Sequence, residues 1–206
     1  MSEVTARSGG PRAPRVRMQP DERREQLIEI GVRMLATRPL EDLSIDALAE
    51  EANISRGLLY HYFANKTEFH VAVVKKLAED LYQITAPTSD DDPMVQLRLS
   101  LDAYLSYVVA NHDPYMALVR AVSGGNPEMA QIYRDARGAL IERLFDRMPD
   151  LDEVGIVDTP AARLVAYSWA GFVEDLVLAW IADDAGLGRD ELLDKLTGVL
   201  ALLLAA

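Results

Sequence analysis

Apolar residues recur at intervals of three and four positions through most of this chain, the spacing that aligns side chains on one face of an α-helix. Phe69, Val73, Leu77 and Leu81 keep an interval of four. A second run with mixed intervals comprises Met129, Ile132, Tyr133, Ala136, Leu140 and Leu144. No segment alternates with period two over the length of a strand, so the pattern predicts an all-α fold of about nine helices.

Helix starts are marked by polar residues that each precede a proline. The polar side chain accepts a hydrogen bond from a free N–H of the first turn, and proline loses nothing there because its missing N–H had no partner. The four pairs are Asp92-Pro93, Asp113-Pro114, Asn126-Pro127 and Thr159-Pro160. They predict helices at about 93–111, 114–123, 127–148 and 160–184.

Three further helices follow from other signals. Asn65 and Glu68 resemble a capping box and predict a helix at 66–85. Two glycines, Gly186 and Gly188, precede a last helix at 189–204, and a first helix at about 20–37 ends before Pro39.

The predicted helix at 160–184 is apolar on nearly every side. Between Leu164 and Ala182 only Glu174 and Asp175 are charged. Such a helix needs cover on nearly every side, and the last helix at 189–204 is also apolar. We therefore expect a homodimer through the helices near 160–184 and 189–204, packed as a four-helix bundle. The alternative is ordinary core within one chain.

Composition excludes several classes of protein. A chain of 206 residues can hold one large or two small domains, and the absence of Cys excludes disulfides and thiolate sites. The longest uncharged apolar stretches, at 176–182 and 199–206, are too short to span a bilayer. We expect no membrane partner and a cytoplasmic protein.

The net charge of −12 is unevenly distributed. Residues 1–66 are neutral, with 10 basic and 10 acidic residues, whereas residues 67–206 carry the whole excess of acid. Residues 1–18 are rich in Gly, Pro and Arg, which predicts a disordered basic arm.

The segment from Ser44 to Glu68 predicts two short helices joined by a tight turn. The first helix is apolar on one side only, through Ile45, Leu48, Ala49 and Ala52. Asn53 suits the turn, because Asn tolerates positive φ better than most residues. Ser55 is the expected cap of a second helix at 56–62 with a polar outer face. This arrangement predicts a helix-turn-helix.

The polar side chains of this motif have the chemistry of DNA contacts. Arg56 can donate two hydrogen bonds to guanine, Gly57 permits close backbone approach, and Tyr60 offers a ring and a hydroxyl. Helix starts favour phosphate through their free N–H groups and dipole. The expected contacts are Ser44, Ser55, Arg56, Gly57, Tyr60, His61 and Lys66. His61 and Lys66 could instead be ordinary solvated residues.

Residues 21–70 resemble the DNA-binding domain of the tetracycline-repressor (TetR) family of bacterial regulators. The matching residues are Ser44, Ile45, Leu48, Ala49, Ala52, Ile54, Ser55, Gly57, Leu59, Tyr60, His61, Tyr62, Phe63, Asn65, Lys66 and Glu68. The resemblance implies a homodimer of nine or ten helices per subunit, a palindromic operator and a small-molecule pocket in the C-terminal domain.

Carried over by position, the resemblance also implies DNA contacts at Ser44, Arg56, Gly57, Tyr60, His61, Tyr62 and Lys66. Tyr60 and Tyr62 could instead pack against the first helix. Three departures from the family affect turns and caps only: Asn53 replaces a usual Gly, Pro39-Leu40 replaces Gly plus an aromatic residue, and Thr67 replaces an acid.

Aromatic residues and methionines on the central helices suit an apolar cavity. The candidate pocket residues are Tyr104, Met116, Tyr133, Trp169 and Phe172, although each could simply belong to the core. Glu174 and Asp175 could bind a cationic ligand, pair across the dimer or face solvent. The three His residues are scattered, and no spacing suggests a metal or catalytic site.

We therefore expect three regions: the arm at 1–18, a helix-turn-helix DNA-binding domain at 19–66, and a ligand-binding and dimerisation domain at 67–206. The predicted function is a ligand-responsive transcriptional regulator without cofactor or catalysis. It would bind a palindromic operator on double-stranded DNA as a repressor, be associated with the nucleoid while bound, and be released by a small, largely apolar effector. The arm at 1–18 either contacts the DNA or is only a solvated tail or start-site artefact. The alternative is an all-helical binding or enzyme-like protein that no longer contacts DNA.

Overall fold

The computed structural model describes residues 19–86, 92–123, 125–147 and 155–205, so the predicted basic arm at 1–18 lies outside it. The described residues form nine α-helices, one short 3₁₀ helix and no strand, which confirms the all-α prediction. The elements are α1 (Pro20–Met34), η1 (Leu40–Asp42), α2 (Ile45–Glu51), α3 (Arg56–Leu59), α4 (Lys66–Ile84), α5 (Pro93–Ala110), α6 (His112–Ser123), α7 (Pro127–Arg147), α8 (Pro160–Ala182) and α9 (Arg189–Leu204).

Three of the four predicted proline-linked caps are present. Asp92 Oδ1 accepts from the N–H of Met94 at 2.8 Å. Asn126 caps α7 in the same way, and Thr159 Oγ1 caps α8 by accepting from Ala162 N–H at 3.0 Å. Local sequence therefore determines where these helices begin, because each cap joins atoms only two or three residues apart.

The fourth predicted helix, near 114–123, is present, but its predicted cap at Asp113 is wrong. Helix α6 begins at His112, and Tyr115 N–H donates to the carbonyl oxygen of Asn111 at 2.9 Å. Asp113 and Pro114 are therefore the second and third residues of the helix. Proline is tolerated there because the first four N–H groups of a helix have no intrahelical partner.

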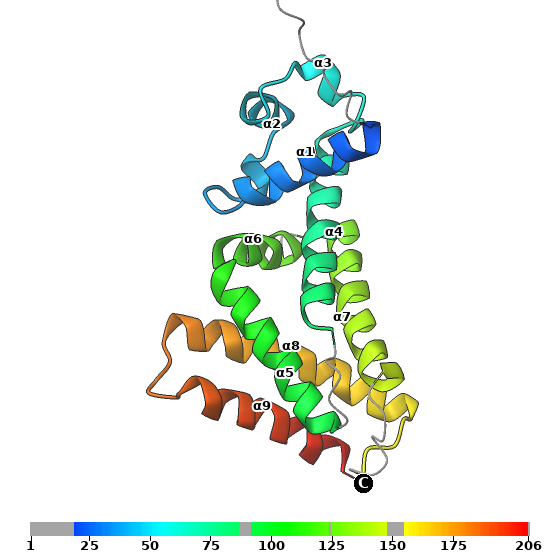
Figure 1. Ribbon diagram of the computed structural model, residues 1–206, viewed down its shortest axis with the longest axis vertical. Helices are drawn as coiled ribbons and strands as arrows, with labels where there is room; N and C mark the ends of the chain where they lie inside the picture. Colours follow the sequence, from blue (N-terminus) through cyan, green and yellow to red (C-terminus); the bar gives the residue numbers. More distant parts are fainter. Residues whose placement is uncertain (1–18, 87–91, 124, 148–154, 206) are drawn as a thin grey trace, which may run out of the picture.

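The buried side chains form two hydrophobic cores. The first core joins α1, η1, α2 and α3 to the first half of α4, with Leu27, Leu48, Leu59 and Phe69 almost fully buried. The second core lies among α5, α7, α8 and α9. Three elements link the cores: α4 runs from one to the other (Figure 1), α6 sends Ala117, Leu118 and Ala121 into the first core, and α7 has Met129 in the first core and Ile141 in the second.

Helix α8 is only partly covered within one chain. Its apolar 18-residue window has a mean hydropathy of 1.4, and 28% of that window is buried. By length and composition alone such a helix could cross a membrane. However, α8 packs against α7 and α9, and it carries a buried ion pair to α7. Its uncovered side includes Leu164 and Phe172, which are 67% and 44% exposed.

Gly31 sets the close approach of α1 to α4. A Cβ atom at this position would lie 2.6 Å from Val73 Cγ2 and 2.7 Å from Phe69 Cζ, two atoms in the first core. We expect Gly31→Ala to lower the free energy of unfolding by about 1–3 kcal/mol, because overpacking forces neighbouring side chains out of place. Urea unfolding at fixed protein concentration measures this change.

Gly138 on α7 is the matched control, since a Cβ there would have no neighbour within 4 Å. Gly138→Ala should raise the free energy of unfolding by roughly 0.5–1 kcal/mol through helix propensity. Equal stabilisation by both substitutions would contradict the packing assigned to Gly31.

Candidate DNA-binding surface and ligand cavity

The predicted helix-turn-helix is formed by α2 and α3. Ser44 Oγ accepts from Ala47 N–H at 3.0 Å, and Ser55 Oγ accepts from Leu58 N–H at 3.3 Å, so each serine caps its helix, which was predicted for Ser55. Asn53 has φ of 51°. This left-handed conformation, which Asn tolerates, turns the chain between the two helices.

The second helix is shorter than the sequence predicts. A helix at 56–62 was expected, but α3 ends at Leu59. The N–H groups of His61 and Tyr62 donate to carbonyl oxygens three residues earlier, those of Leu58 and Leu59, so the chain tightens into a turn. Phe63, which is fully buried beneath this turn, fixes its position on the core.

Six of the eight predicted DNA contacts are exposed on this part of the molecule: Ser55, Arg56, Gly57, Tyr60, His61 and Lys66. Tyr60 is 56% exposed. Ser44 is half-buried, and Tyr62 is half-buried against the first core, so packing accounts for part of its surface. The Lys66 ammonium also donates to the carbonyl oxygen of Glu41, which ties the start of α4 to η1.

Sequence reasoning missed two features of this surface. Leu58 is 38% exposed on α3. Asp46, the second residue of α2, forms an ion pair with Arg56 in which Oδ1 and Nε are 2.6 Å apart. The pairing joins two helices, so no pattern within either helix could have indicated it.

The imidazole of His70, on α4, contacts the segment just before the helix-turn-helix. Its Nε2 lies 2.7 Å from the carbonyl oxygen of Leu43, in the segment just before α2. Burial lowers the pKa of His70, and the neutral ring can donate to that carbonyl group. This contact helps to hold the helix-turn-helix in a fixed place on α4.

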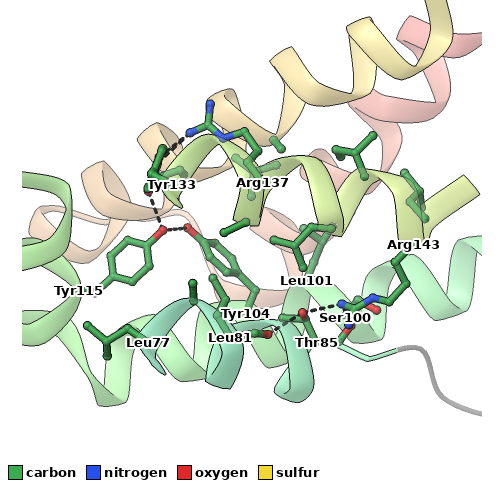
Figure 2. A pocket seen from close by; sticks show the side chains of 18 of the residues that line it. Leu77, Leu81, Thr85, Ser100, Leu101, Tyr104, Tyr115, Tyr133, Arg137 and Arg143 are labelled. Carbon is green, nitrogen blue, oxygen red and sulfur yellow. Dashed lines mark hydrogen bonds and ion pairs between the residues drawn. The ribbon is translucent and has the colours of Figure 1, made fainter. Parts of the chain in front are cut away.

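A cavity of about 140 Å³ lies among α4, α5, α6, α7 and α8. Its middle is lined by apolar side chains, among them Leu77, Leu81 and Leu101 (Figure 2). Three of the five predicted pocket residues line it, namely Tyr104, Tyr133 and Trp169. Met116 and Phe172 do not belong to the lining, and Phe172 points to the exposed side of α8.

Polar groups gather at one end of the cavity (Figure 2). Glu174 on α8 accepts hydrogen bonds from the Tyr115 hydroxyl at 2.6 Å, from the Tyr133 hydroxyl, and from Arg137 Nη2 at 2.8 Å. The hydroxyls of Tyr104 and Tyr115 are 3.0 Å apart. One hydrogen-bonded network therefore joins α5, α6, α7 and α8.

Burial raises the pKa of the Glu174 carboxyl, because the charged form loses its hydration, and the hydrogen bond from Tyr115 acts in the opposite direction. Burial likewise raises the pKa of Tyr104 and of Tyr115, so both hydroxyls stay protonated. The network thus places hydroxyl groups and one guanidinium around a single carboxyl group.

Two of the three roles considered for Glu174, facing solvent and pairing across a dimer, need correction. Glu174 is buried and pairs with Arg137 of its own chain, so it neither faces solvent nor needs a partner across a dimer. Arg137 was not singled out from the sequence, because its partner lies 37 positions away. Asp175, the next residue, is exposed.

The opposite end of the cavity is closed by Arg143. Its guanidinium donates to the carbonyl oxygen of Thr85 at 2.7 Å, to Thr85 Oγ1 at 2.7 Å, and to the carbonyl oxygen of Tyr82. These bonds satisfy carbonyl groups at the end of α4, which have no partner within the helix. They also tie the end of α4 to α7.

Comparisons with known proteins agree with this architecture. Residues 27–73 match bacterial regulatory proteins of the tetR family, and residues 93–202 match the tetracyclin repressor-like C-terminal domain. The HTH-type transcriptional activator FasR of Mycolicibacterium smegmatis is 22% identical over 178 residues, 84% of this chain and 79% of that protein. The HTH-type transcriptional regulator BetI of Stenotrophomonas maltophilia is 27% identical over 161 residues, 76% of this chain and 80% of that protein.

A solved structure shares the fold. The crystal structure of a tetR-family transcriptional regulator from Streptomyces coelicolor superposes with a TM-score of 0.73 at 27% identity, covering 90% of this chain and 82% of that one. The C-terminal match alone spans more than half of the chain. This chain belongs to the tetR family of bacterial transcriptional regulators.

Proposed function

We propose that this regulator is a homodimer that binds a palindromic operator as a repressor and is released by a small, largely apolar effector. The exposed polar face from Ser55 to His61, held on a rigid helical base, is the observation that carries this proposal. FasR is named an activator. The direction of regulation in this protein therefore needs a transcription measurement as well as a binding measurement.

On DNA, α3 and the turn after it enter the major groove. Arg56 and Tyr60 face base edges, while Ser44, Ser55 and Lys66 hold phosphates at three helix starts. Phosphate contacts fix the register, and the base contacts read the sequence. Two such motifs related by a two-fold axis read half-sites about 34–36 Å apart or a multiple of that spacing.

The dimer interface that we propose is the uncovered side of α8 together with α9. Leu164 and Phe172 on α8 and Leu202 and Leu203 on α9 are between 44% and 77% exposed in one chain. Exposed apolar side chains that cluster on two adjacent helices indicate a contact surface. A second copy covers them in a four-helix bundle.

The effector site is the cavity that ends at Glu174. Its apolar middle suits a ring or short chain, and the network of hydroxyl groups and Arg137 suits one polar group on the ligand. All three links between the cores border the cavity, through Leu77 on α4, Tyr115 on α6 and Tyr133 on α7. An effector that favours a different placement of these helices depopulates the DNA-competent state.

Arg56→Ala should weaken binding to the operator by roughly 5- to 150-fold, the value of one bidentate contact to guanine. Tyr60→Ala should also weaken specific binding, and neither change should reduce helicity. Footprinting on DNA that flanks the gene locates the operator, and titration measures the affinities. No protected palindrome there or in a genome-wide selection would count against the proposal.

Lys66→Ala serves as the contrasting variant. It should lower affinity for operator and unrelated DNA alike. It should also reduce the slope of log affinity against log salt concentration by about one, the value for one phosphate contact. Unchanged affinity in the Arg56, Tyr60 and Lys66 variants would show that α3 does not read DNA.

Phe172→Asp should convert the dimer to monomers and weaken operator binding at least tenfold, because an unpaired charge is costly at an apolar interface. Analytical ultracentrifugation measures the assembly. Val109→Asp on α5 is the matched control, since Val109 is 48% exposed but lies on neither α8 nor α9. A Phe172→Asp protein that remains dimeric would contradict the interface.

An effector found by a thermal-shift screen of small apolar compounds should raise Tm by roughly 5–10 °C at about 100 times its Kd. Leu101→Trp, which fills the cavity, should abolish that shift relative to its own ligand-free Tm. Leu99→Trp on the exposed side of α5 should retain it. A full shift in Leu101→Trp would place the effector elsewhere.

A further inference from the structure

An acidic side chain lies on the surface that faces DNA in the proposed complex. Asp46 follows Ser44 by two positions, and its Oδ1 is 2.6 Å from Nε of Arg56, the first residue of α3. The side chains of Asp46 and Arg56 are 54% and 69% exposed. The pair is therefore exposed to solvent, and one of its members, Arg56, is a residue that we propose to contact DNA.

Fold stability does not account for this pair. Exposed ion pairs contribute little, because solvent screens the charges and two side chains must be ordered. Asp46 is already favourable near the start of α2, where the helix dipole attracts a negative charge, and that effect needs no Arg56. A carboxylate close to phosphate groups also weakens attraction to DNA. The pair thus indicates a role in recognition.

The geometry of the guanidinium group supplies that role. Asp46 engages Nε, and among the described residues no other acceptor binds Arg56. The two Nη groups at the end of the side chain consequently keep their N–H donors for an external ligand. The O6 and N7 atoms of guanine accept two hydrogen bonds from one guanidinium in the major groove.

We propose that Asp46 is a positioning residue that orients Arg56 toward a guanine in each half-site and lowers affinity for DNA without that guanine. This inference rests on the proposed DNA-binding function. At the operator, Arg56 binds guanine through its Nη groups and still neutralises Asp46 through Nε. On other DNA, Arg56 turns to a phosphate, and Asp46 is left unpaired beside the backbone. Specificity arises from this difference between the two states.

The test compares the dissociation constants of the dimeric protein for its operator and for a scrambled duplex. Asp46→Ala should lower the ratio of operator to scrambled affinity about tenfold, largely through tighter binding to the scrambled duplex. Replacing one half-site guanine by 7-deazaguanine removes N7. This should weaken wild-type binding, weaken Asp46→Ala binding less, and leave Arg56→Ala binding unchanged.

Glu50→Ala is the matched control, because Glu50 is an exposed acid on the same helix and its loss changes the charge equally. It should tighten binding to both duplexes and leave their ratio unchanged. Asp46→Asn keeps the shape of the side chain and should lower the ratio of operator to scrambled affinity less than Asp46→Ala does. This second variant controls for a folding defect in the alanine variant.

The outcomes separate the two proposals. A wild-type protein without any site-specific binding overturns both. Specific wild-type binding with an unchanged ratio in Asp46→Ala, or with an Arg56→Ala protein that still responds to 7-deazaguanine, overturns only the role of Asp46. A fall in the ratio confined to Asp46→Ala and Asp46→Asn, absent from Glu50→Ala, supports it.

Discussion

Helix α4 is the constraint on which the rest of this molecule depends, because one unbroken helix belongs to both cores. Its 19 residues span roughly 28 Å at the usual rise of an α-helix. Phe69 and Val73 are buried with the DNA-binding helices, whereas Leu81 lines the cavity at the other end. A packed helix transmits a displacement along its length rather than absorbing it. Any change in the cavity that moves the end of α4 must therefore be accommodated where α4 meets α1 and the helix-turn-helix.

Helix α6 is a shorter link between the two cores, and a hydrogen bond to a buried carboxyl group holds it in place. Tyr115 donates to the buried carboxyl group of Glu174, while Leu118 lies in the first core. A buried carboxyl group is tolerated only when its hydrogen-bonding capacity is satisfied. A ligand that forms a hydrogen bond with Tyr115, Tyr133 or Arg137 removes one hydrogen-bond partner from Glu174. The network therefore switches between distinct arrangements and does not deform gradually. The same network thus couples the cavity to the position of α6.

The parts of this structure that the sequence predicted depend on short-range contacts. The caps at Asp92, Asn126 and Thr159 and the positive φ of Asn53 each involve atoms a few residues apart. The start of α6 was missed because proline is acceptable at several positions of a first turn. Which side chains line the cavity depends on the rotation of each helix about its axis, and only tertiary packing determines that rotation. Phe172 and Trp169 illustrate this, since they lie three positions apart, yet only Trp169 reaches the cavity.

The distribution of charge explains how an acidic protein can bind an acidic polymer selectively. Residues 67–206 carry a net charge of −12, whereas residues 1–66 are neutral. Repulsion from residues 67–206 extends over about one Debye length, ~8 Å at physiological salt, so it opposes close approach of DNA to the faces that these residues form. Residues 1–66 have no excess of positive charge to provide strong attraction to arbitrary sequences. In the complex that we propose, affinity comes from the few contacts around α3, and those contacts depend on the sequence they meet. The acidic residues outside the motif and Asp46 within it therefore have the same effect in this proposal. Both lower the affinity for DNA that lacks the operator sequence.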